Sequence, residues 1–75
     1  MFNYKINVLE ALAEKGYSCN RMRKEKILSE GTMQSIREHK SITLNTLNTI
    51  CIILRCQISD IIEINPTDEE KIKFF

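Results

Sequence analysis

A chain of 75 residues with a net charge of +1 describes one small domain. A chain of this length buries only about 60 % of its unfolded surface, so it forms a single core without a cleft between domains. No apolar run approaches the roughly 20 residues that cross a membrane, and the N-terminal residues resemble neither a secretory signal nor a transit peptide. We therefore expect a cytoplasmic protein with no membrane contact.

The charge is unevenly distributed along the chain. Residues 1–14 sum to −1, residues 15–40 carry seven Lys and Arg against three Glu and sum to +4, and residues 41–75 sum to −2. A basic segment can displace counterions from a phosphate backbone and so bind nucleic acid. It can equally be the solvated face of an amphipathic helix. Charge alone leaves both readings open.

Three cysteines, Cys19, Cys51 and Cys56, form no CxxC pair, and His39 is the only histidine. An odd number without paired spacing does not indicate a disulfide framework, and a zinc site needs more ligands at closer spacing. We expect reduced thiols, with Cys51 and Cys56 in the core and Cys19 near the surface. We expect no metal and no cofactor.

The first predicted helix runs from about Lys5 to Lys15. Apolar residues at helical spacing give it one broad apolar face: Ile6, Val8, Leu9, Leu12 and Ala13. Gly16 follows the helix and suits a left-handed cap, while Lys15 complements the helix dipole in the last turn.

Two short helices are predicted between about residues 18 and 38, joined by a tight turn. Ser18 caps a helix of about Cys19–Lys26, and Ser29 caps one of about Glu30–Glu38. Four apolar residues are predicted to anchor this pair in the core: Met22, Leu28, Met33 and Ile36. The remaining surface of the second helix is polar or small, as in a helix that enters the DNA major groove.

After a loop at 39–42, Thr43 is predicted to cap a helix over Leu44–Leu54. A periodic stripe places this helix at the centre of the core: Leu44, Leu47, Ile50, Cys51 and Leu54. A connector then turns Cys56 and Ile58 inward.

Ser59 is predicted to cap a single turn over Asp60–Glu63, and Pro66 ends regular structure. The tail, residues 66–75, is expected to fray in a monomer. Its terminal Phe74 and Phe75 either fold back on the core or pack on a second subunit.

From about residue 5 to 65, the chain resembles the XRE family, the lambda-repressor and Cro type of helix-turn-helix. The matching segments are Lys15-Gly16-x-Ser18, Met22, Leu28-Ser29, Met33, Ile36-Arg37, Ile42-Thr43-Leu44, Thr46-Leu47, Ile50-Cys51, Leu54 and residues 56–63. The resemblance implies an all-α fold, a compact bundle of five helices, with a DNA-binding domain at 1–65 and a tail at 66–75. It also implies sequence-selective DNA binding as a transcription regulator, commonly as a dimer.

Some positions depart from the pattern of this family. Ile27 stands where a turn glycine is usual, which predicts either about 1–2 kcal/mol of strain at positive φ or a different turn geometry. Cys19 stands where a glutamine often holds a phosphate, and His39 where a glycine often follows the reading helix. Gly31 costs the reading helix about 1 kcal/mol relative to alanine, or lets the backbone approach DNA closely.

The resemblance also implies site residues. Those expected to meet base edges are Glu30, Gly31, Gln34 and Ser35, and those expected to meet phosphates are Ser18, Lys26, Ser29, Arg37 and Lys40. Gln34 can bond adenine with both amide groups, and Glu30 can accept from cytosine. The plain alternatives are that Glu30 is a first-turn acid favoured by the helix dipole, that the serines are only caps, and that the basic residues are solvated surface.

The sequence thus predicts a DNA-binding regulator, acting as a homodimer on a pseudo-palindromic operator. The tail or residues 60–65 would supply the dimer contact. The alternative is a degenerate helix-turn-helix that binds protein, which the modest charge, the aromatic tail, and the acids Glu30 and Glu38 on the reading face favour. No catalytic constellation appears, because a Cys19–His39 dyad has nothing to bring its members together. No small-molecule ligand is indicated.

Overall fold

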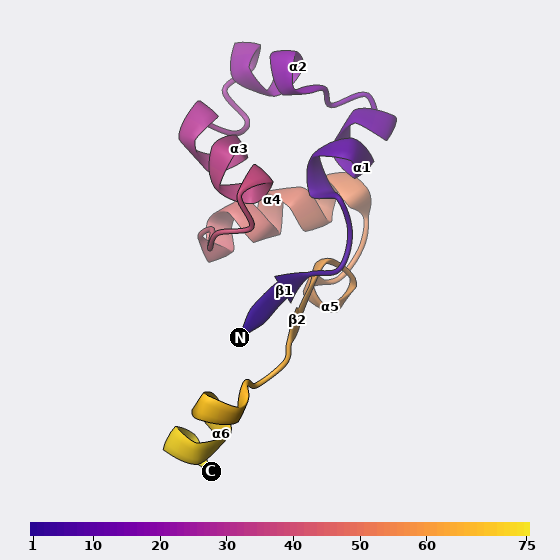
Figure 1. Cartoon of the computed structure of the whole chain (residues 1–75). Helices are drawn as coiled ribbons and strands as arrows, with labels where there is room; N and C mark the ends of the chain where they lie inside the picture. Colours follow the sequence, from indigo (N-terminus) through magenta and orange to yellow (C-terminus); the bar gives the residue numbers. More distant parts are fainter.

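The computed structural model describes all 75 residues as six helices and two short strands (Figure 1). In chain order these are β1 (Phe2–Tyr4), α1 (Val8–Glu14), α2 (Cys19–Lys24), α3 (Glu30–Arg37), α4 (Leu44–Leu54), α5 (Ile58–Ile61), β2 (Ile62–Ile64) and α6 (Asp68–Phe74). The helix-turn-helix expected at about 18–38 is therefore α2 and α3. No helix has both the length and the apolar character needed to cross a membrane.

Local capping fixes where the helices begin. The side chains of Ser18, Ser29 and Thr43 each accept a hydrogen bond from the backbone N–H three residues later, which confirms these predicted caps. Asn7 does the same for α1, so this helix begins at Val8 and not at Lys5. Gly16 follows α1 with φ of 88°, the left-handed conformation expected of it.

The core gathers residues from α1 through α5. Nine side chains are buried: Val8, Leu12, Met22, Leu28, Met33, Ile36, Leu47, Ile50 and Ile61. All four anchors predicted for the helix pair are among them. No polar or charged residue is buried, so apolar packing holds this core together without an internal network of polar side chains.

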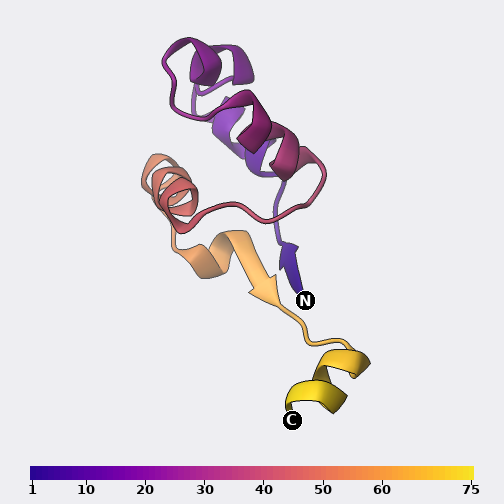
Figure 2. The same cartoon turned by 90° about the vertical axis from the view of Figure 1, so that its left-hand side faces the viewer.

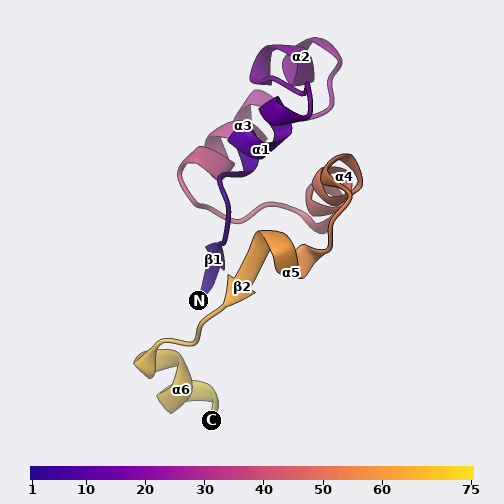
Figure 3. The same ribbon diagram turned by 90° about the vertical axis from the view of Figure 1, so that its right-hand side faces the viewer.

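A two-stranded antiparallel sheet corrects the all-α expectation. Phe2 pairs with Ile64 and Tyr4 with Ile62, so residues about 60 positions apart lie side by side. The pairing continues at one end, where the N–H of Lys5 donates to the Ile61 carbonyl at 2.7 Å. The sheet joins the first and last parts of the domain, beside α5 in Figures 1 and 3.

The α4–α5 region differs from its prediction in three places. Leu44 was expected in the core, yet it is 75 % exposed, because it lies outside the face that Leu47 and Ile50 bury. Ile58 is exposed as well. Helix α5 begins at Ile58 with Gln57 as its N-cap, so the predicted Ser59 cap is wrong: Ser59 lies inside the helix.

The three cysteines are free and all are partly buried against the core, so the expected contrast between a surface Cys19 and two core thiols is not found. Arg55 ends α4 in a left-handed conformation, and the N–H of Cys56 returns to the Cys51 carbonyl at 3.0 Å. Burial, and then the neighbouring Cys51, raise the pKa of the Cys56 thiol.

The tail forms α6, a sixth helix where fraying was expected. Thr67 and Glu70 cap it reciprocally, and Glu70 also pairs with the Met1 ammonium. No residue of α6 is buried, and the helix projects beyond the sheet, away from the other helices (Figures 1 and 2). The molecule therefore measures 45 × 23 × 18 Å, with a radius of gyration of 13.8 Å against about 11 Å for a compact chain of this length.

Candidate nucleic-acid interface

The turn between α2 and α3 places its left-handed residue at Lys26, where φ is 57°. Ile27, for which strain was considered, has no positive φ. Its N–H donates to the Met22 carbonyl at 2.9 Å, and its side chain packs half-buried against the core. The turn thus accommodates a β-branched residue by moving the left-handed position one residue earlier, onto an unbranched lysine.

The loop after α3 also turns through a left-handed residue, His39, with φ of 59°. The ring of Tyr4 packs edge-on against His39, with ring centres 5.9 Å apart, and the Tyr4 hydroxyl donates to the Lys40 carbonyl at 2.6 Å. Burial raises the pKa of Tyr4, which favours the protonated hydroxyl that donates this hydrogen bond. Strand β1 therefore holds the end of α3 in place.

The outer face of α3 carries all four predicted base-contact residues. Glu30, Gly31 and Gln34 are exposed and Ser35 is half-buried, whereas Met33 and Ile36 point into the core. A Cβ at Gly31 would meet no atom within 4 Å, so the protein alone gives no packing reason for glycine there. The open backbone leaves this part of α3 accessible to a large ligand.

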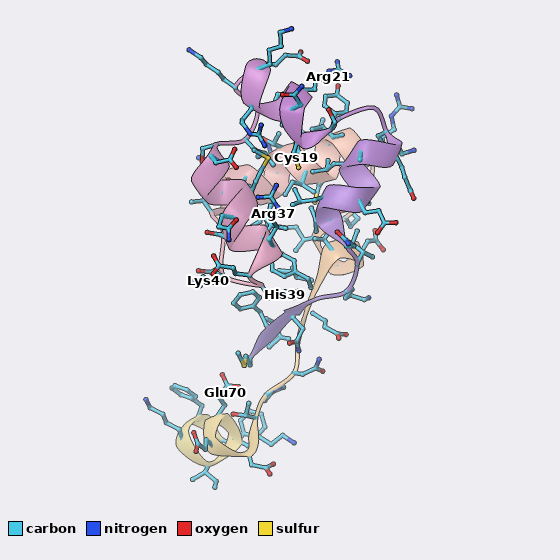
Figure 4. All side chains as sticks on the ribbon, turned by 45° about the horizontal axis from the view of Figure 1, so that its top comes forward. Cys19, Arg21, Arg37, His39, Lys40 and Glu70 are labelled. Atoms are coloured by element: carbon cyan, nitrogen blue, oxygen red, sulfur yellow. The ribbon has the colours of Figure 1, made fainter.

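Ion pairs organise the side of α3 that faces α2. Glu30 pairs with Arg23, and its other oxygen lies 4.0 Å from the Arg37 guanidinium. Arg37 donates to Gln34 Oε1 at 3.3 Å and to Cys19 Sγ at 3.4 Å, and Figure 4 shows Arg37 between α3 and Cys19 of α2. Two arginines thus offset the Glu30 charge, and Cys19, at the usual glutamine position, orients Arg37.

The five predicted phosphate contacts are all exposed, but their partners differ. Ser18 and Ser29 are N-caps, and the Ser29 hydroxyl also donates to Thr32 Oγ1 at 2.9 Å. Lys40 lies 3.7 Å from the Glu38 carboxylate, so Glu38 has the cationic partner that it needs beside phosphates. Lys26 makes no ion pair within the chain, and neither does Lys24, which sequence reasoning did not single out.

A shallow hollow between α3 and the start of α4 was missed by the sequence reasoning. Its lining is almost entirely hydroxyl-bearing or small: Ser29, Gly31, Thr32, Ser35, Ser41, Ile42, Thr43 and Thr46. The Thr43 hydroxyl lies 3.0 Å from that of Thr46, at the N-terminus of an 11-residue helix. Uncharged hydroxyls and helix N-terminal amides suit an anionic ligand. The available signal was the density of Ser and Thr over residues 41–46.

Comparisons with known proteins agree with this fold. The crystal structure of the transcriptional regulator VanUg, form II, resembles the chain with a TM-score of 0.62 and 24 % sequence identity, covering 88 % of this chain and 87 % of that one. No relative with a curated description has significant similarity. The model of the Cro/C1-type HTH DNA-binding domain matches residues 7–67. The chain therefore belongs to the Cro/C1-type helix-turn-helix family of DNA-binding domains.

Proposed function

We propose that this chain is a sequence-specific transcription regulator that inserts α3 into the DNA major groove and acts as a homodimer on a pseudo-palindromic operator. The observation that carries the proposal is the outer face of α3, where Gly31, Gln34 and Ser35 lie opposite the buried Met33 and Ile36. A short helix with a polar, unobstructed face and a fixed inner face is the element that reads base edges in this family.

Within that face, Gln34 is the residue best suited to direct base recognition. Its amide can donate to adenine N7 and accept from the adenine amino group. Arg37 already donates to Gln34 Oε1, and an amide oxygen has two lone pairs, so one remains for the base. Arg37 would thus fix the amide orientation before DNA arrives. Glu30, Gly31 and Ser35 are proposed as the other base contacts.

Charge on the helix pair supports DNA binding more than the sequence suggested. The acids Glu30 and Glu38, which favoured a protein-binding alternative, are both paired with cations. Lys15, Lys24 and Lys26 form no ion pair within the chain. These lysines are free to displace counterions from phosphates, and Arg37 and Lys40 would exchange a carboxylate for a phosphate on binding.

Phosphate contacts are proposed on both sides of α3. Ser18, Lys26, Ser29, Arg37 and Lys40 would hold the backbone, and the hydroxyls of Thr43 and Thr46 extend the same surface to α4. Such contacts set the position of a domain on DNA without reading sequence. We assign DNA binding to residues 1–65 and the dimer contact to residues 66–75. Two copies about one helical turn apart would double a small footprint.

The test is fluorescence anisotropy with a DNA site selected from a random pool and a scrambled control, at two salt concentrations. Gln34→Ala should lose about 1–3 kcal/mol of preference for the selected site, because it removes a bidentate base contact. Lys26→Ala should weaken binding to both DNAs and lower the salt slope by about 1. Lys5→Ala removes the same charge from a residue that is assigned to no base, phosphate or dimer contact, and whose ammonium donates to the Ser59 carbonyl, so it serves as the control.

Weak binding without preference between the two DNAs, unchanged by Gln34→Ala and Lys26→Ala, would contradict the proposal. A selected site bound with full preference by Gln34→Ala would keep DNA binding but remove Gln34 from base recognition.

A further inference from the structure

The outward side of α4 is an unusual surface for a helix exposed to water. Residues 41–54 contain no charged side chain, while Leu44 is 75 % and Ile52 67 % exposed. These two residues border a groove between α4 and α5, whose lining also includes Asn48, Cys51, Arg55 and Ile58. Depletion of charge around exposed apolar groups is characteristic of the centre of a protein interface.

Helix α6 carries exposed apolar side chains that could fill such a groove. Ile72 is 84 %, Phe74 73 % and Phe75 88 % exposed, and no residue of α6 is buried. The Met1–Glu70 pair holds the start of α6 at the end of the sheet, so that the helix projects away from its own α4 (Figures 1–3). One chain therefore displays an apolar helix and, elsewhere, an apolar groove, and leaves both without a partner.

We propose that α6 of one copy seats in the α4–α5 groove of a second copy, and that the reciprocal contact closes a two-fold dimer. This inference deepens the homodimer proposed above and rests on it. The groove is then occupied by α6 of a second copy of this chain, with Phe74 and Phe75 packing on Leu44 and Ile52. A reciprocal exchange satisfies both surfaces of both copies and leaves no open end for further growth.

Unpaired charges at the ends of the two surfaces support this occupant. Arg55 lies at the rim of the groove and makes no ion pair within its own chain. Asp68 and Glu69, in the first turn of α6, likewise have no basic partner. With the apolar end of α6 in the groove, the acidic first turn can meet Arg55, and complementary charges of this kind fix orientation more than they add affinity.

The proposed dimer leaves the DNA-facing surface open. An α-helix advances about 100° per residue, so Leu44 and Asn48 each lie about 200° around α4 from Thr46. Thr46 lines the hydroxyl-rich hollow beside α3, whereas Leu44 and Asn48 line the groove. A partner on the groove therefore does not cover α3.

Sedimentation velocity of the full chain over a range of concentrations tests the inference. Two variants target the two surfaces: Phe74→Ala combined with Phe75→Ala on α6, and Ile52→Asp in the groove. Each should raise the dimer dissociation constant at least tenfold without changing the fold, because every substituted side chain is exposed. Asn20→Asp on α2 adds the same charge at an exposed helix position and should leave the dimer unchanged.

Mixing the two variants provides the sharper result. The Ile52→Asp copy has an intact α6 and the Phe74→Ala, Phe75→Ala copy has an intact groove, so a mixed dimer keeps one of its two contacts. With one variant fluorescently labelled, the mixture should associate more tightly than either variant alone. A mixture that associates no better than its components would overturn the exchange and indicate pairing of α6 with α6, or of groove with groove.

The remaining outcomes separate this inference from the proposed function. A dimer that both variants leave intact would overturn the exchange and retain the homodimer. A wild-type chain that stays monomeric at all concentrations would overturn both the homodimer and the exchange. Binding of the wild-type chain to a single half-site, measured by anisotropy, reports on α3 independently of either result.

Discussion

The helix-turn-helix and the C-terminal helix α6 have the same kind of N-cap, but only the helix-turn-helix packs into the core. Helices α3 and α6 each begin with a hydroxyl cap, Ser29 in one and Thr67 in the other. Helix α3 then buries Met33 and Ile36 in the shared core, while α6 buries nothing. Capping thus decides where a helix starts, and burial decides whether it belongs to the domain.

The exposed sides of the two helices differ in polarity. Helix α3 shows polar groups whose charges are balanced by neighbours, and α6 shows Ile72, Phe74 and Phe75. A polar, preorganised face suits the hydrogen-bonding edges of bases, whereas an apolar face needs another protein surface. This contrast supports the two proposals made above, recognition of DNA by α3 and association through α6.

Truncation of a buried anchor should give the largest effect. Met33→Ala removes a side chain with no exposed surface and should lower the free energy of unfolding by about 2–5 kcal/mol. For a chain of this size that is a large share of the total, about 4–11 kcal/mol. Urea unfolding followed by circular dichroism measures the change.

The matched substitution on the tail is Ile72→Ala, measured with dilute, monomeric protein. It should change the unfolding free energy by less than about 0.5 kcal/mol, because Ile72 is almost fully exposed. Equal losses in the two variants would show that α6 packs on the domain and would remove the contrast between the regions.

Local features of the fold were predictable from the sequence because their causes are local. The caps Ser18, Ser29 and Thr43 and the anchors Met22 and Met33 follow from residue type and spacing. The sheet was not predictable, because Phe2 pairs with Ile64 across the whole chain. Strands of three residues are also too short to show an alternation of apolar and polar residues. The exposure of Leu44 depends on which face of α4 the core selects. The capping box Thr67–Glu70 was visible in the sequence but was overlooked after Pro66.

For the candidate interface, the sequence indicated which residues lie on the outer face of α3, since helical period alone determines that. It did not indicate their partners. The pairing of Glu30 with Arg23, and the contact of Arg37 with Cys19, depend on the angle between α2 and α3. At Ile27 the sequence left two alternatives, strain at positive φ or a different turn geometry. The structure shows the second, with the left-handed residue at Lys26, and only the hydrogen-bond pattern of the turn distinguishes them.

A smaller effect is expected in acid, which should break the Met1–Glu70 contact and free α6 before it unfolds the rest of the domain. The hydrogen bond from the Met1 ammonium, followed by that from the Thr67 backbone, lowers the pKa of Glu70. Because the contact lowers this pKa, it contributes stability fully above the usual glutamate pKa, and the contribution is lost as pH falls through the lowered value. The protection factors of the α6 amides, which correct for the slower intrinsic exchange in acid, should therefore fall there while those of α3 stay high.

Glu70→Gln is the control for this prediction. Its α6 amides should have low protection factors at neutral pH as well, with no further fall on acidification. Unchanged protection of α6 in the wild-type chain down to pH 3 would contradict the role of the Met1–Glu70 pair in holding α6.

The proposal that α3 and the start of α4 bind DNA while α6 does not is tested by titrating isotope-labelled protein with selected DNA and following the amide NMR shifts. The protein is kept above the dimer dissociation constant, so that α6 is already in its dimer contact before DNA is added. The largest shifts are expected at Gly31, Gln34 and Ser35, with further shifts at Thr43 and Thr46, and small shifts throughout residues 68–74. Shifts concentrated in α6, or spread evenly and identical with scrambled DNA, would contradict it.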